Sequence, residues 1–576
     1  MNMLRIRHIM EMRRASKEPP LLPPKLKRSV NDFDRKSSTK EILNIHISLR
    51  NIKSDNRTSK NLMCLFYDSH GGLNGPWELI FGTETFPVCS DIDISSSFSI
   101  EFVFERPQPI RMDLCACSKN EVIVLGTAYI LISDIVLSKL VQKTFINEST
   151  GNDVGQIIVK STIMKKPSPL FLQFEGKNFS KKLLAESALL SFEIVGHEPN
   201  GDRILLYKSE TLKQGSRIIW KAFTLGIDNI KEELRPLEVA CRFNDEKYHN
   251  AIVGSFVTTF TELRHNEEFV LSNPSYKCGK KMCGQFDLIK RTELTTCSFL
   301  DYLNFGTIIN FAFAIDFSDA EGLQDREAQI SFTNNVEFAI RSVGETLFGY
   351  TRNNNLLAYG LGARIPPHYR GSHEFCLNLE TDPTCVGVDG VLEAFRRTLV
   401  QIKPCKNAQF SHVIYHISKN AQNAAIRSDQ SRPQYCIINI ITRGAIADIK
   451  ETVQAAIFAS KLPVSIIFTG IGDQNLNEID RLGSNGGRLS FHGRKSERDN
   501  LHYVNMTRVL LEHDGPMEES IFTLSEKSLY QIPKQIASYF IKNGVVPMEK
   551  KARLKIESSS GSECLLQSMA EDDENE

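Results

Sequence analysis

Three residues that could bind a ligand, Asp316, Ser318 and Arg443, lie close behind runs of apolar residues. A carboxylate and a hydroxyl two positions apart supply oxygen ligands of the kind that Mg²⁺ and Ca²⁺ accept. A guanidinium can instead bind a carboxylate through two parallel hydrogen bonds. The same three residues therefore allow two different sites, one for a metal ion and one for an acidic partner.

The elements that position these residues follow from the apolar runs themselves. Residues 307–315, 435–442 and 464–469 are too continuously apolar for strands with one wet face, and they predict three strands buried on both faces. Two apolar stripes with helical spacing lie between them: Val336, Ile340, Val343 and Leu347, then Val453, Ala456, Ile457 and Leu462. Alternating strands and helices predict a doubly wound α/β domain over residues 285–545, whose binding crevice lies beyond the carboxyl ends of the strands.

The preceding part of the chain predicts two antiparallel β-sandwiches. From residue 41 apolar and polar residues alternate strictly, as at Ile45, Ile47 and Leu49, which indicates half-buried strands and a sandwich over residues 41–150. A similar pattern over residues 155–265 predicts a second sandwich, and residues 277–284 are expected to link it to the α/β domain.

Both ends of the chain are expected to be disordered. Residues 1–40 are basic and interrupted by prolines, and we interpret them as a solvated leader or, alternatively, as a segment that touches anionic lipid. Residues 546–576 lose all periodicity and end in the acidic stretch 571–576, which is typical of a solvated tail.

Composition narrows the classes of function. With 69 basic and 69 acidic residues no overall field favours nucleic acid. Thirteen cysteines, an odd and scattered count, favour reduced thiols and a cytoplasmic location. No apolar run reaches the roughly 18 residues that a membrane span needs. No Gly-x-Ser-x-Gly elbow or complete dinucleotide motif is present, so we expect no enzyme and no catalytic residues.

Six motifs carry a resemblance to a known family, the copines. They are Ser-Phe-Leu-Asp-Tyr at 298–302, Ala-Ile-Asp-Phe at 314–317, Gly-Leu-Gly-Ala-Arg-Ile-Pro-Pro at 360–367, Ser-His-Glu-Phe at 372–375, Gly-Val-Asp-Gly at 387–390 and Ala-Ser-Lys-Leu-Pro at 459–463. The resemblance covers roughly residues 40–548. It implies two C2 domains, a von Willebrand factor A-like domain, and calcium-dependent binding to phospholipid.

The calcium ligands implied by this resemblance are incomplete. Calcium takes six to eight oxygens, so a C2 site needs several carboxylates. In the first sandwich Asp55 stands in the first aspartate position, Asn61 replaces the second, and Glu121 is alone in the later loop. In the second sandwich Asp245 remains, while Phe243, Lys247 and Ala251 occupy positions where the family has aspartates. We therefore expect Asp55 and Asp245 to be vestigial ligands and calcium binding to be weak or lost.

The metal site of the A-like domain departs from the family too. The family pattern is Asp-x-Ser-x-Ser, of which Asp316 and Ser318 remain with Ala320 in the last place, and its Thr-Asp-Gly reads Thr442-Arg443-Gly444. A cation about 5 Å from a divalent ion repels it by roughly 6 to 7 kcal/mol at an effective dielectric constant near 20, so magnesium is not expected. Either Arg443 turns to solvent while Asp316 caps the next helix, or Arg443 pairs with Asp316 and offers its guanidinium to an acidic protein partner.

Two functions are consistent with these residues. The first is a copine-like adaptor, peripheral at the cytoplasmic side of the plasma membrane, which contacts anionic phospholipid through Lys165, Lys166, Lys181 and Lys182 and recruits protein partners through the A domain. The alternative is a calcium-independent protein-interaction scaffold that does not bind membranes.

Overall fold

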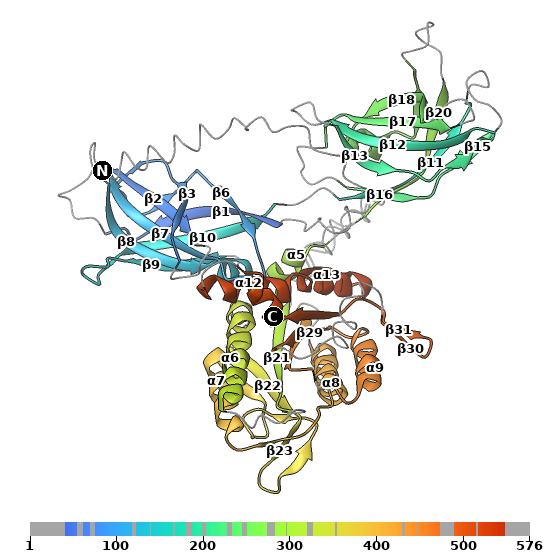
Figure 1. Cartoon of the computed structure of the whole chain (residues 1–576). Helices are drawn as coiled ribbons and strands as arrows, with labels where there is room; N and C mark the ends of the chain where they lie inside the picture. Colours follow the sequence, from blue (N-terminus) through green and yellow to red (C-terminus); the bar gives the residue numbers. More distant parts are fainter. Residues whose placement is uncertain are drawn as a thin grey trace, which may run out of the picture. The chain divides into compact units, whose positions relative to one another are not determined.

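The computed structural model describes residues 41–53, 61–69, 75–117, 122–138, 140–164, 168–179, 187–197, 203–226, 233–244, 250–273, 283–294, 297–318, 326–351, 354–428, 432–444, 446–472, 489–513 and 517–547. These residues form two compact units. One unit combines the chain up to Ile163 with the chain from Cys297 onward, and the other comprises residues 164–296 (Figure 1).

The first sandwich is built from ten strands. They are β1 (Glu41–Arg50), β2 (Asn61–Asp68), β3 (Glu78–Gly82), β4 (Phe86–Pro87), β5 (Ile92–Asp93), β6 (Phe98–Phe102), β7 (Pro109–Cys117), β8 (Val122–Leu131), β9 (Leu140–Ile146) and β10 (Asp153–Ile163), with helix α3 (Ile132–Ser138) after β8. The alternation in β1 places Ile45, Ile47 and Leu49 in the core, as predicted. The expected boundary at residue 150 is too early, because β10 pairs with both β1 and β9 and completes this sandwich.

The second unit is a sandwich of two five-stranded sheets. One sheet contains β11 (Leu170–Lys177), β15 (Arg217–Ile219), β16 (Phe223–Leu225), β19 (Glu268–Leu271) and β20 (Gly284–Glu293). The other contains β12 (Leu189–His197), β13 (Arg203–Lys208), β14 (Leu212–Lys213), β17 (Leu237–Asn244) and β18 (Ala251–Thr258), and helix α4 (Phe260–His265) follows β18. Aromatic side chains, including Phe174, Phe192, Trp220 and Phe286, fill the core between the sheets.

The second sandwich extends beyond the predicted range of residues 155–265. Strand β20 pairs along its length with β11, so the sandwich ends at Glu293. The expected linker at residues 277–284 is therefore followed by another strand of the same sandwich, rather than by the α/β domain.

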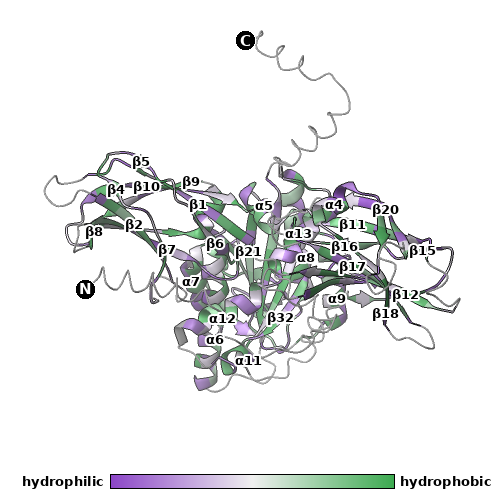
Figure 2. Cartoon of the chain, turned by 90° about the horizontal axis from the view of Figure 1, so that it is seen from above, coloured by the Kyte–Doolittle hydropathy of each residue, from purple (hydrophilic) through white to green (hydrophobic). Residues whose placement is uncertain are grey.

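The α/β domain has a sheet in the order β25-β22-β21-β28-β29-β32, with β26 also paired to β22. Its strands are β21 (Ile308–Asp316), β22 (Asn355–Leu361), β25 (Phe375–Cys376), β26 (Thr384–Val386), β28 (Gln434–Thr442), β29 (Val464–Gly470) and β32 (Leu501–Asn505). The five strands β22, β21, β28, β29 and β32 are parallel. The three predicted buried strands are confirmed as β21, β28 and β29. Figure 2 shows hydrophobic stretches on the strands of both sandwiches and of the α/β domain.

Helices cover both faces of this sheet (Figure 1). They are α5 (Phe299–Asn304), α6 (Arg326–Phe348), α7 (Gly387–Leu399), α8 (Ser411–Arg427), α9 (Ile449–Ala459), α11 (Met506–Leu511), α12 (Met517–Leu529) and α13 (Ile532–Lys542). Phe311 and Phe313 of β21 belong to the core on the α6 and α7 side, whereas Ala312 and Ala314 belong to the core on the α8 and α9 side.

One predicted helix stripe is confirmed and the other is corrected. All four residues of the α6 stripe are fully buried. In α9 the buried face is Thr452, Ala455, Ala456, Ile457 and Ala459, so Val453 lies at its margin and Leu462 lies beyond the helix end. Three of the buried residues are alanines, Ala455, Ala456 and Ala459, whose small side chains allow α9 to pack closely against α8 and the sheet.

A small sheet extends from the α/β domain next to β22. It consists of β23 (Ala363–Ile365), β24 (Arg370–Ser372) and β27 (Lys403–Pro404), with β23 in the middle. A two-stranded hairpin, β30 (Ser490–Phe491) and β31 (Arg494–Lys495), lies before β32. Within the described ranges no helix is long and apolar enough to cross a membrane.

Candidate functional site

The candidate site lies where the neighbouring parallel strands β21 and β28 end. Asp316, the last residue of β21, is almost completely buried. Its Oδ1 accepts a hydrogen bond from the Ser318 backbone N–H at 2.9 Å, and its Oδ2 accepts one from Thr442 Oγ1 at 2.7 Å. Both oxygens of the carboxylate are therefore engaged by the protein itself.

Burial decides the ionisation of this carboxyl. Removal from water raises the pKa of Asp316, because the charged form is poorly solvated there. The contacts with Ser318 and Thr442, and the positive charge of Arg443, oppose this rise in pKa without cancelling it. The folded protein thus holds the Asp316 carboxylate at a cost in free energy.

Gly362 closes one side of the site. Its φ of +71° lies in the left-handed region, which residues with a Cβ adopt at a cost. A Cβ at this position would stand 3.0 Å from both Asp316 Oδ1 and the Ser318 backbone nitrogen. The glycine of the Gly-Ala-Arg motif therefore allows the chain after β22 to pack directly on the Asp316 carboxylate.

Arg443 follows β28 and lies over the loop after β21. Its guanidinium donates a hydrogen bond to the carbonyl oxygen of Ser318 at 2.5 Å and lies 4.7 Å from the centre of the Phe332 ring. A carbonyl and an aromatic face together favour a fixed cation. The structure therefore places this positive charge close to Asp316, where it opposes part of the rise in the pKa of Asp316 that burial causes.

The residues of this site do not fit a divalent metal ion. Its carboxylate uses both oxygens for internal hydrogen bonds, and a guanidinium lies close by. The buried Ser318 Oγ, which has no well-formed hydrogen bond to a described residue, adds one neutral oxygen. Over the described residues no group of three or more His, Cys, Asp or Glu side chains could hold a metal ion.

Several predicted site residues lie outside the described residues: Asp55, Asp245, Glu121, Lys165, Lys166, Lys181, Lys182, Lys247 and Ala320. Of the neighbouring positions that the structure describes, Asn61 begins β2 opposite Cys117. Phe243, which stands where the family has an aspartate, is buried in the core of the second sandwich. Its side chain therefore contributes to packing.

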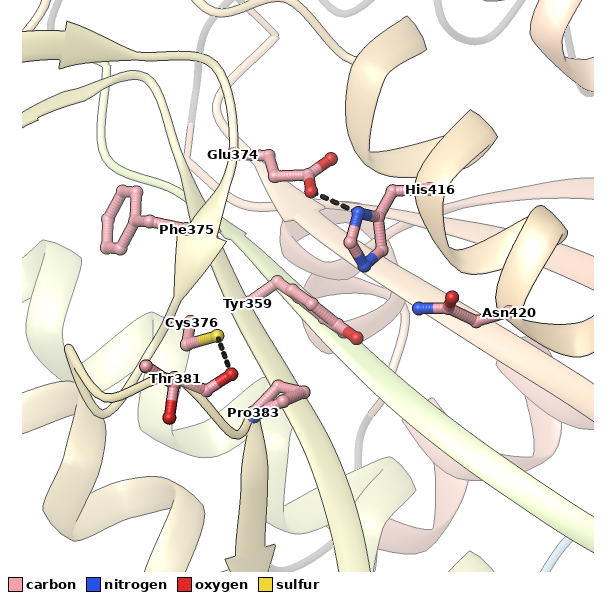
Figure 3. A pocket seen from close by; sticks show the side chains of 8 residues that line it. All are labelled: Tyr359, Glu374, Phe375, Cys376, Thr381, Pro383, His416 and Asn420. Atoms are coloured by element: carbon pink, nitrogen blue, oxygen red, sulfur yellow. Dashed lines mark hydrogen bonds and ion pairs between the residues drawn. The ribbon is translucent and has the colours of Figure 1, made fainter.

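A cavity of about 310 Å³ beside the small sheet was not predicted from the sequence. It is lined by Tyr359, Glu374, Phe375, Cys376, Thr381, Pro383, His416 and Asn420 (Figure 3). Glu374 Oε1 and His416 Nδ1 form an ion pair of 2.5 Å at its rim, and burial raises the pKa of Glu374 while His416 and His412 oppose that rise. The spacing of His412 and His416, one turn apart on α8, was the available signal in the sequence.

Comparison with known proteins supports the resemblance to the copines. A sequence model of the family described as Copine matches residues 328–548. "Copine family protein 5" from Caenorhabditis elegans is 27% identical over 514 residues, covering 84% of this chain and 70% of that protein.

Two solved structures are also similar to parts of the chain. "BON1-C2B" is 18% identical and covers 23% of this chain and 95% of its own, with a TM-score of 0.21. The pair of C2 domains of Extended-Synaptotagmin 2 is 12% identical and covers 48% of this chain and 99% of its own, with a TM-score of 0.22. Scores this low carry no argument, so the description of the sandwiches rests on their own strand pairing.

Proposed function

The chain belongs to the copine family, and from this premise we propose that it is a peripheral membrane adaptor without enzymatic activity. It attaches to anionic phospholipid at the cytoplasmic side of the plasma membrane. Its A domain, residues 297–547, recruits protein partners, and neither step depends on calcium or magnesium.

The observation that carries this proposal is the contact between Arg443 and Ser318 beside the buried Asp316. In a metal-dependent site a carboxylate of the partner completes the coordination of the ion. Here a guanidinium occupies the same edge of the sheet, and a guanidinium binds a carboxylate directly. We propose that Arg443, held in place by Ser318 and Phe332, receives an acidic side chain of the partner while Asp316 orients the loop.

Weak calcium dependence is supported by what replaces the aspartates. Asn61 is neutral, and Phe243 is a core residue that cannot turn outward without exposing an aromatic ring. Membrane attachment would then depend on local positive charge, at roughly 1 kcal/mol for each basic group near an anionic surface. Lys165, Lys166, Lys181 and Lys182 are the proposed contacts.

Vesicle co-sedimentation of the full chain tests this proposal. We expect equal pelleting with phosphatidylserine-containing vesicles in calcium and in chelator, and none with phosphatidylcholine alone. The fourfold variant K165E/K166E/K181E/K182E should lose most of the pelleting. Pelleting only in calcium would contradict the calcium-independent attachment, and no pelleting under any condition would favour the alternative scaffold without membrane binding.

A further inference from the structure

Four exposed cations share the small sheet that follows β22. Arg364 lies on β23, Arg370 on β24 and Lys403 on β27, and Lys406 follows β27. Residues 361–373 and 401–407 contain no aspartate or glutamate. As far as the structure describes the chain, none of the four forms an ion pair, although many other arginines and lysines do.

Two of these cations are held side by side. Arg364 and Lys403 are direct partners on neighbouring antiparallel strands, so their side chains leave the same face of the sheet. Like charges in directly opposite positions destabilise a sheet. Lys403 Nζ also lies 4.7 Å above the ring of Tyr369, which is 41% exposed. The sheet thus holds concentrated positive charge at a cost to its own stability.

This basic sheet adjoins the Arg443 site. Gly362 connects β22 to β23, and it packs against Asp316 and Ser318. The Cys405 backbone N–H, one residue after β27, donates to the Gly362 carbonyl at 2.8 Å. Because Arg443 donates to the Ser318 carbonyl, the two positive regions meet at Gly362 and Ser318 and lie at the same edge of the A domain.

We infer that the sheet β23-β24-β27 is a docking surface for an acidic segment of a partner protein, rich in glutamate or aspartate. The inference rests on the proposed function and extends it, since it names the chemistry of the partner and the surface that binds it. Carboxylates bind arginine through paired hydrogen bonds, and they also relieve the repulsion between Arg364 and Lys403.

The arrangement of this unit favours a protein partner over a lipid surface. The first sandwich contacts the A domain near the amino end of β21, where the Leu300 backbone N–H donates to Glu41 and the rings of Phe104 and Phe299 meet edge to face. The basic sheet lies beyond the carboxyl ends of the parallel strands. The two surfaces therefore lie at opposite ends of the central sheet.

Strand β10, the last strand of the first sandwich, ends at Ile163. Ile163 pairs with Leu43 near the start of β1, so this end of the sandwich lies close to the A domain. The nine-residue β21 separates its two ends by about 30 Å. A bilayer bound near its amino end would leave the basic sheet at the distant end of the A domain, accessible to a protein.

Fluorescence anisotropy of the full chain with a labelled ten-residue glutamate peptide tests the inference at low and physiological salt. The double variant R364E/K403E should weaken binding at least tenfold, and salt should weaken binding to the parent chain. The matched variant K419E/R427E, which changes two exposed cations of α8 by the same charge, should bind like the parent. A second pair, R364Q/K403Q, provides the test if the charge reversal does not fold.

The peptide-binding results distinguish failure of this inference from failure of the proposed function. If the parent does not bind the glutamate peptide, or if R364E/K403E binds like the parent, the inference is overturned. If R364E/K403E binds the peptide like the parent but R443A does not, the proposed function still holds. Recognition of the acidic partner would then be confined to the Arg443 site. Tighter binding of phosphatidylserine vesicles or of a ten-nucleotide poly-dT strand, lost in R364E/K403E, would also overturn it in favour of a lipid or nucleic-acid surface.

Discussion

Thr442 donates its hydroxyl hydrogen to Asp316 Oδ2 over 2.7 Å, and this bond joins the ends of the neighbouring strands β28 and β21. Thr442 Oγ1 in turn accepts a hydrogen bond from the Gly444 backbone N–H at 2.8 Å. The turn that carries Arg443 is therefore fixed to the Asp316 carboxylate through protein hydrogen bonds alone. A crevice of this kind can keep its shape without an ion.

The first prediction concerns the charge of Asp316. Burial raises the pKa of Asp316 above its ordinary value of 3.8. The contribution of Asp316 to the free energy of unfolding is therefore most favourable below pH 3.8, where the carboxyl is protonated, and it is lost as the pH rises through the folded-state pKa. We expect Asp316→Asn to raise the melting temperature at neutral pH by roughly 2–4 °C for each kcal/mol regained. The gain should shrink toward pH 4, as measured by thermal unfolding across pH.

Asp448 provides the control for this substitution. Its two carboxylate oxygens accept hydrogen bonds from the backbone N–H groups of Phe410 and Ser411, so the amide nitrogen of an asparagine would face one donor that cannot reverse its role. At Asp316 the partner of Oδ2 is the Thr442 hydroxyl, which can rotate to accept a hydrogen bond from an amide. Asp448→Asn should therefore destabilise the protein by about 1–3 kcal/mol. If Asp316→Asn lost as much stability at pH 7, the buried carboxylate would be favourable and our interpretation of its pKa would be wrong.

A second prediction concerns the close packing at Gly362. Gly362→Ala should destabilise the protein by more than about 2 kcal/mol, because it combines left-handed backbone strain with contacts of 3.0 Å to Asp316 and Ser318. Gly493, with a φ of +75° and nothing within 4 Å of an added Cβ, isolates the backbone contribution, which is about 1 kcal/mol. Urea denaturation should separate the two variants, and equal losses would argue against a tightly packed crevice.

The sequence predicted the parts of this fold that depend on local pattern. Strands β21, β28 and β29 are buried on both faces, so their apolar runs in the sequence are unbroken. As the runs predicted, β21 ends at Asp316 and β28 ends one residue before Arg443. The sandwich boundaries depend instead on distant pairing. Strand β10 belongs with β1, and β20 with β11, more than 100 residues apart, and no local pattern records which of two adjacent sandwiches a strand will join.

Two features of the A domain could not be predicted for the same reason. Arg364 and Lys403 lie 39 positions apart and become neighbours only through the pairing of β23 with β27. Glu374 directly precedes β25 and His416 lies on α8, so the two residues come into contact only through the tertiary fold. Each residue alone is typical of a solvated surface, and only the tertiary fold gathers their charges.

A third prediction concerns the contact between the first sandwich and the A domain. Phe104 is buried, with its ring 4.8 Å from Phe299 and 4.7 Å from Tyr350. Phe104→Ala should cost about 3–5 kcal/mol and separate the unfolding of the sandwich from that of the A domain into two calorimetric transitions. Phe174→Ala, in the other unit, should lower only the transition of the second sandwich. Coincident transitions in the Phe104 variant would show that this contact does not couple the two domains.

The last prediction asks whether Arg443 has taken the place of an ion. Arg443→Asp removes a repulsion of roughly 6 to 7 kcal/mol and adds a carboxylate ligand, so magnesium affinity should rise by up to about 10⁵-fold. Arg443→Ala, which removes the repulsion alone, should gain much less. Both variants should lose metal-independent binding of the glutamate peptide, because neither retains the guanidinium beside Ser318.

Isothermal titration with magnesium chloride measures this gain directly. The variant R443D/A320S, which also restores the missing hydroxyl, should bind more tightly than R443D, since a serine at position 320 completes the Asp-x-Ser-x-Ser pattern. Absence of binding heat in both variants would mean that the loop geometry itself, rather than the charge of Arg443, excludes the ion. Retained peptide binding in R443A would remove Arg443 from partner recognition and leave that role to the neighbouring basic sheet.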